Sequence, residues 1–181
     1  MNELYETRGT AVAASRNVAP PGTSALLLSQ AGLQDRGYVC VHTGVLTLAP
    51  SARLACFRGL VQRLLDDGIA VALTGPAGQL AFAAEFRTQL RVEAGILLAD
   101  FVGRTSLGTL TDLVSRARLL ISDGPGATRI AATVQTPSLI VDGYAVPATG
   151  FFATRPHPWV EARVDLLLRA ARALMRAGDA Y

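Results

Sequence analysis

The sequence predicts an α/β domain of three layers, in which helices cover both faces of a parallel sheet of about five or six strands. Two observations lead to this prediction. Short apolar runs rich in valine, isoleucine and leucine recur along the chain, and helical segments of about ten residues or more separate them. Strands that are apolar throughout are buried on both faces, and intervening helices permit right-handed parallel crossovers. The pattern is typical of a doubly wound, Rossmann-like domain.

The N-terminal part of the chain differs in composition from the rest. Residues 1–23 are polar, small and proline-rich, and they end near Pro20-Pro21-Gly22, so we interpret them as a flexible tail or linker. Residues 24–181 are expected to form a single domain. Its first element is a short helix over 24–32, with Ser24 as a cap and Gly32 as its stop.

The alternation of strands and helices then becomes regular. Strands are predicted at YVCVH (38–42), IAVALT (69–74), GILLA (95–99), 118–122 and 138–141. Helices are predicted over 51–67, where Leu54, Phe57, Leu60 and Leu64 follow helical spacing, and over 78–91, 106–116 and 127–134. A final amphipathic helix is expected from the spacing of Val160, Val164, Leu167, Leu168, Ala171 and Met175.

The charged residues exclude several kinds of chemistry. All 17 basic residues are arginines, so a mechanism that needs a lysine ammonium is excluded. The formal net charge is only +3, the arginines are dispersed, and aromatic residues make up 6% of the chain. A nucleic-acid interface would need a basic stripe interleaved with aromatics, so we expect no nucleic-acid partner.

Metal, cofactor and membrane sites are also not expected. The chain has two cysteines, Cys40 and Cys56, in apolar surroundings, and two histidines, so we predict reduced core thiols and neither a metal site nor a cofactor. No apolar run approaches the ~18 residues of a membrane span. The polar N-terminus is not a signal peptide, and we expect a soluble cytoplasmic protein.

The strand ends are the places to look for a ligand site, because open α/β sheets bind ligands at the carboxyl ends of their strands. At Asp123-Gly124-Pro125-Gly126 a strand feeds a glycine-rich turn that opens a helix. Free backbone N–H groups at such a helix end suit a diphosphate, with Thr128 and Arg129 adding a hydroxyl and a cation. The other interpretation is that these glycines only make a tight strand-to-helix turn, and the motif leaves both open.

Residues 24–143 also resemble, in order, the C-terminal half of the glycosyltransferase family nine enzymes, the heptosyltransferases of lipopolysaccharide assembly. The resemblance rests on a leucine-rich lead helix from Ala25 to Leu33, on YVCVHTG, on LTGP, on DFVGRTSLGTL at 100–110 and on LLISDGPGATRIAATVQTP. It implies half of a GT-B fold, the half that binds the nucleotide-sugar donor without a metal. In that family the other half holds the acceptor and the catalytic aspartate, so no catalytic residue is assigned here.

The carry-over from the family is partial. Anchoring on RIAA places Arg129 on the family's histidine, and Asp123 then falls one place before the family's aspartate. The loop after the first strand lacks the family's lysine, and Gln79 stands near the place of the acidic residue that holds the donor ribose. The donor-binding residues predicted from the strand ends and the resemblance are Thr43, Gly44, Thr74, Gly75, Gln79, Asp123, Gly124, Pro125, Gly126, Ala127, Thr128 and Arg129.

The resemblance predicts a glycosyltransferase-like domain that binds a nucleotide-diphosphate sugar of the ADP-heptose type. It would act with an acceptor-binding half or partner protein, or as a homo-oligomer, and would be inactive alone. The alternative is a non-catalytic nucleotide or ligand-binding module that retains the fold. A small, unrelated Rossmann-like enzyme is disfavoured, because paired carboxylates at a strand edge, a GxSxG elbow and a His/Cys/Asp triad are all missing from the sequence.

Overall fold

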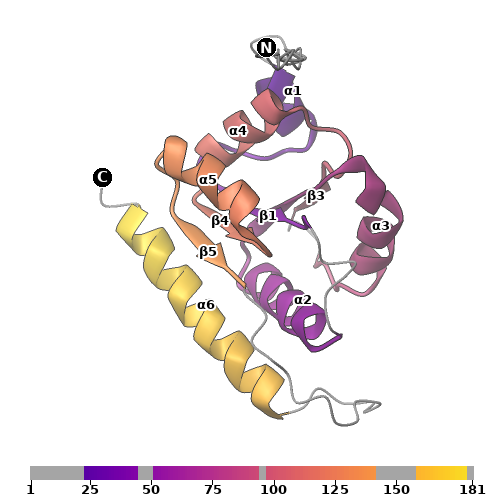
Figure 1. Ribbon diagram of the computed structural model, residues 1–181, viewed down its shortest axis with the longest axis vertical. Coiled ribbons are helices and arrows are strands. Elements are labelled where there is room, and N and C mark those ends of the chain that lie inside the picture. The colour runs from indigo at the N-terminus through magenta and orange to yellow at the C-terminus, as the bar shows by residue number, and fades with distance from the viewer. Residues whose placement is uncertain (1–22, 45–50, 94–96, 142–157, 179–181) are drawn as a thin grey trace, which may run out of the picture.

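The computed structural model describes residues 23–44, 51–93, 97–141 and 158–178 (Figure 1). Within these ranges a single parallel sheet contains β1 (Tyr38–His42), β2 (Ala70–Thr74), β3 (Leu98–Asp100), β4 (Leu119–Ser122) and β5 (Ser138–Ile140). The strand order is β3-β2-β1-β4-β5, so β1 is central and β3 and β5 are the edges. The predicted parallel sheet is therefore confirmed, with five strands in the described part of the chain.

Helices lie on both sides of this sheet (Figure 1). In chain order they are α1 (Thr23–Gln30), α2 (Ser51–Asp66), a 3-10 turn η2 (Ala77–Gln79), α3 (Leu80–Thr88), α4 (Leu107–Ser115), α5 (Pro125–Thr133) and α6 (Pro158–Gly178). Gly32 and Gly68, which follow α1 and α2, have φ angles of +69° and +77°. Glycine adopts this left-handed conformation without steric cost, which explains why both helices end there.

The alternating side chains of β1 define two separate cores. Val39 and Val41 face the layer formed by α2, α3 and α6, where they contact a cluster that includes Phe57. Tyr38 and Cys40 face the opposite layer formed by α1, α4 and α5. Because side chains alternate along a strand, β1 can bury its residues from Tyr38 to Val41 on both faces of the sheet.

The C-terminal helix α6 covers its own sheet. It contacts α2, β4 and β5, and a Cβ placed on Gly59 of α2 would stand only 2.9 Å from Val164 Cγ2. Arg172 of α6 donates hydrogen bonds to both carboxylate oxygens of Asp67, at 2.8 and 2.6 Å. The predicted amphipathic helix is thus confirmed, and its apolar side belongs to the core of this domain.

Two element boundaries differ from those predicted. The third strand occupies Leu98–Asp100 instead of 95–99, of which 95–96 lie outside the described residues. The bounds of β3 follow from its pairing with β2, which sets Val71 opposite Leu98. A run of apolar residues in the sequence does not reveal that register. The helix predicted over 78–91 begins as the η2 turn and is α-helical only from Leu80 to Thr88.

Candidate functional site

Gly44 joins three loops at the carboxyl edge of the sheet. Its N–H donates a hydrogen bond of 2.9 Å to Asp123 Oδ1, which follows β4. Its carbonyl oxygen accepts a hydrogen bond from Gln79 Nε2 in the η2 turn after β2. The side chains of Asp123 and Gln79 are both only 5% exposed. Three residues predicted from separate segments therefore form one hydrogen-bonded group, and two of them use their side chains to hold the third.

A second group of predicted residues lies deeper and is bonded within the protein. Thr43 donates to the carbonyl oxygen of Thr74 through its backbone N–H, at 2.8 Å, and through its hydroxyl, at 3.2 Å. Thr43 and Thr74 are fully or almost fully buried, and Gly75 is buried beside them. These residues hold the loops after β1 and β2 together, and their role toward a ligand stays a prediction.

Gly75→Ala is expected to lower the free energy of unfolding by about 1–3 kcal/mol, because a Cβ there overpacks a buried site. That atom would stand 2.6 Å from Thr43 Oγ1, and Thr43 is held by its own hydrogen bonds. Urea denaturation measures the change. Gly78→Ala is the matched control, since its Cβ meets nothing within 4 Å, and a shift within about 0.5 kcal/mol is expected. Equal stabilities for the two variants would contradict this loop geometry.

The N-terminal end of α5 presents backbone donors that no described residue pairs with. Gly124 is the N-cap and Pro125 the first helical residue, and no side chain caps the helix. The Gly124 N–H donates to Ser122 Oγ, at 3.2 Å. The N–H groups of Gly126 and Ala127 are too early in the helix for intrahelical bonds, and the described residues offer them no partner. Two donors at the positive end of the helix dipole thus remain available.

Open space lies next to this helix end. A Cβ built on Gly124 or on Gly126 would meet no heavy atom within 4 Å, so neither glycine is required by packing in the described structure. Thr128 is half-buried, and Arg129 in the following turn is exposed and forms no ion pair with any described residue. The loop predicted to bind a diphosphate is therefore accessible to solvent, and the Arg129 guanidinium is not paired with any described carboxylate.

Two residues outside the predicted set also lie at this edge. His42 and Ser122 end β1 and β4, and the sheet register pairs them with each other and His42 with Thr74. His42 Nδ1 is 3.1 Å from Thr74 Oγ1. Burial lowers the pKa of His42, and the Asp123 carboxylate opposes this by raising it. Both are the final residue of an otherwise apolar strand, and this position is what could have identified them from the sequence.

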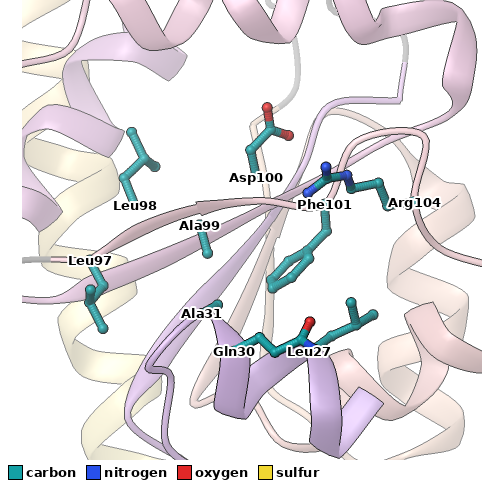
Figure 2. Close-up of a pocket in the computed structure, with 9 residues that line it drawn as sticks. All are labelled: Leu27, Gln30, Ala31, Leu97, Leu98, Ala99, Asp100, Phe101 and Arg104. Atoms are coloured by element: carbon teal, nitrogen blue, oxygen red, sulfur yellow. The ribbon is translucent and has the colours of Figure 1, made fainter. Parts of the chain in front are cut away.

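A cavity of about 270 Å³ lies between α1 and the edge strand β3. Figure 2 shows Ala99 and Phe101 directed toward α1, whereas Leu98 and Asp100 lie on the other side of the strand. Gln30 of α1 and Arg104 after β3 add polar groups to the lining. None of the predicted donor-binding residues lines this cavity, so the sequence prediction did not include it.

The described residues contain neither a metal-binding cluster nor a helix that could span a membrane. No three histidine, cysteine, aspartate or glutamate side chains there gather closely enough to hold a metal ion. None of the described helices is both long and apolar enough to cross a membrane.

Comparison with known protein families gives one match that covers more than half of the chain. The family described as "Glycosyltransferase family 9 (heptosyltransferase)" matches residues 53–161. Among curated proteins, lipooligosaccharide heptosyltransferase 2 of Haemophilus influenzae is 30% identical over 88 residues. The aligned region is 49% of this chain and 25% of that protein.

Two solved structures share the fold. The glycosyl transferase family 9 protein from Veillonella parvula superposes with a TM-score of 0.63 at 15% identity, over 85% of this chain and 50% of that one. E. coli ADP-heptose lps heptosyltransferase II superposes with a TM-score of 0.57 at 16% identity, over 84% of this chain and 53% of that one. The chain thus spans about half the length of these solved structures.

Proposed function

This chain belongs to glycosyltransferase family 9, and from that membership we propose that it binds a nucleotide-diphosphate sugar donor of the ADP-heptose type. The proposed site is the carboxyl edge of the sheet, at the N-terminal end of α5. Because the chain spans about half of its solved relatives, we also propose that a separate acceptor-binding domain or subunit completes the transferase.

The α5 helix end is the observation that supports this function most directly. Gly126 and Ala127 offer backbone N–H groups without described partners, and no side chain competes for them. An anion at this position gains from both hydrogen bonds and the helix dipole. The diphosphate of the donor is the anionic group that this geometry suits.

The space above the two glycines supports the same placement. A ligand phosphate can approach the backbone at Gly124 and Gly126 because no side chain fills that volume in the described structure. Arg129 lies within one turn of these donors on the same helix and is exposed. In a chain without lysine, arginine must supply any cationic phosphate contact.

The nucleoside end of the donor is proposed to extend along the sheet edge toward β3. From β4, which leads into α5, the order of strands is β1, β2 and then β3. Three strand spacings correspond to about 14 Å, a span that a nucleoside diphosphate can bridge. The cavity beside β3 offers the apolar ring of Phe101 and the polar side chains of Gln30 and Arg104, which together fit a base or ribose.

The transfer chemistry follows from this arrangement. When the sugar leaves its diphosphate, negative charge develops on the departing phosphate oxygen. Donors that are already oriented toward that oxygen stabilise it with little reorganisation, and here they are the α5 N–H groups and Arg129. The base that activates the acceptor hydroxyl would come from the acceptor-binding half, so the chain alone is expected not to turn over.

A non-catalytic ligand-binding module is the second candidate, and one observation favours it. Asp123 and Gln79 both use their side chains to hold Gly44, which leaves fewer polar groups for the donor than the family resemblance implies. The Asp123 carboxylate also places a negative charge close to the proposed diphosphate position. This candidate predicts a stable fold that does not distinguish donor sugars.

Isothermal titration calorimetry with ADP-, UDP- and GDP-sugars tests the donor proposal. Saturable binding of at least one of them is expected, with ADP-sugars preferred. Gly124→Ala should weaken that binding while leaving the melting temperature unchanged, because its Cβ would meet no protein atom within 4 Å and would enter the space proposed for the phosphate. Failure of all three classes at millimolar concentration would remove the donor proposal and favour the ligand-binding module.

A further inference from the structure

His42 occupies the centre of a polar row at the carboxyl edge. It ends the central strand β1, with Thr74 of β2 and Ser122 of β4 opposite it in register. Since side chains alternate along a strand, His42 points to the same face as Cys40, which contacts the layer containing α5. The imidazole therefore lies beneath the loop that leads from β4 into the proposed donor site.

The two ring nitrogens have different surroundings. Nδ1 is 3.1 Å from Thr74 Oγ1, and the Thr74 hydroxyl donates its proton to the Val41 carbonyl oxygen, at 3.4 Å. The Nδ1–H of the neutral ring therefore donates to Thr74 Oγ1, and Nε2 carries a lone pair. Nε2 lies 3.6 Å from the position that a Cβ on Gly44 would take, and Asp123 Oδ1 lies 3.0 Å from the same point. No described residue forms a hydrogen bond with Nε2. This unbonded nitrogen is turned toward Gly44 and Asp123.

The groups around His42 set its charge in the absence of a ligand. Burial is the largest influence and lowers its pKa, and Asp123 raises it. The Cys40 thiol on the same strand is neutral, because burial raises its pKa to about 12. Thr74 and Ser122, on the neighbouring strands, do not titrate, and Arg129 of α5 is exposed to solvent. A ligand with two negative charges would outweigh these influences and favour the imidazolium form.

Building on the proposed donor site, we infer that His42 is a proton-dependent contact for the donor diphosphate. The ring takes up a proton at Nε2 as the anion binds, and the new Nε2–H donates a hydrogen bond to a phosphate oxygen while Nδ1–H continues to donate to Thr74 Oγ1. Donor affinity is then highest at low pH and decreases as the pH rises through the pKa of the bound ring. The contact would make release of the nucleotide dependent on proton release.

Calorimetry with ADP-glucose at about pH 5.5 and about pH 8, on either side of the usual histidine range, tests this inference. The diphosphate of ADP-glucose is a diester and does not titrate in this interval, so a proton taken up must come to the protein. Titrations in buffers of different ionisation enthalpy count that proton. We expect uptake of up to one proton on binding. The affinity should be roughly tenfold higher at the lower pH for each unit by which the ligand raises the pKa of His42.

His42→Gln keeps an amide donor near Nε2 and removes the titration. This variant is expected to bind at about pH 8 but to lose most of the pH dependence, whereas His157→Gln, at the other histidine of the chain, should retain it. If His42→Gln does not fold, the His42 ring signal in NMR spectra of the wild-type protein provides the same test, since its pKa should rise with ADP-glucose.

The outcomes separate the two proposals. Absence of binding at both pH values would overturn the donor site itself and this inference with it. Binding with equal affinity at both pH values, an unchanged His42 pKa on binding, or the same pH dependence in His42→Gln would overturn the role of His42 and leave the donor site standing.

Discussion

Phe57→Ala is expected to lower the free energy of unfolding by about 3–5 kcal/mol, the largest change predicted for a single substitution in this chain. Phe57 is fully buried in α2. Its ring meets Phe86 of α3 edge to face, with centroids 6.3 Å apart, and belongs to the cluster that joins α2, α3 and α6 to the sheet. Removing the ring leaves a cavity among elements that cannot all close over it.

Thermal and urea denaturation measure this effect. For a domain of this size the melting temperature should decrease by roughly 6–20 °C. Leu166→Ala is the control, because Leu166 lies on α6 but is 63% exposed, and its effect should stay within about 0.5 kcal/mol. A loss of less than about 1 kcal/mol for Phe57→Ala would mean that this helical layer does not pack on the sheet as described.

Arg129→Ala is expected to weaken donor binding by about 1.5–3 kcal/mol, which corresponds to a roughly ten- to 150-fold higher Kd. The proposed site would lose a charge-assisted, bidentate contact to phosphate, and the chain has no lysine to replace it. Stability should change little, because the side chain is exposed and forms no ion pair with the described residues.

Calorimetry with the best-binding nucleotide sugar measures the effect of Arg129→Ala. Arg176→Ala is the matched control, since this arginine lies exposed in the last turn of α6 and should leave the Kd unchanged. Arg129→Lys should give an intermediate Kd, because the charge remains and the fork geometry is lost. An unchanged Kd in Arg129→Ala would show that the start of α5 is a structural turn without a ligand role.

The order and type of the elements could be predicted well from the sequence. The first four residues of YVCVH are buried because β1 is covered on both faces. The helical spacing of Phe57, Leu60 and Leu64 reflects one buried face. The stop at Gly32 could be predicted because a positive φ after a helix favours glycine, and Gly68 adopts the same conformation after α2. The third strand was misplaced because its bounds depend on pairing with β2.

The candidate site could be predicted only in part. The sequence predicted Gly44, Gln79 and Asp123 as donor-binding residues, which stays a prediction, and it did not show that they bond to one another. The cavity beside β3 was not predicted either, because it requires α1 and the edge strand to be placed in space. Family resemblance supplied a ligand class, and the geometry supplied the free donors of α5 and the orientation of His42.

The sequence by itself determined the fold class, the absence of lysine chemistry and the strand ends where a ligand would bind. Those properties depend on composition and local periodicity, which can be read directly from the order of residues. The tertiary structure alone decided which polar groups are already used and which remain free. Gly44 and Asp123 are 79 residues apart, and Gln79 is 35 residues from Gly44. Their hydrogen bonds exist only because the parallel sheet brings three strand ends to one edge.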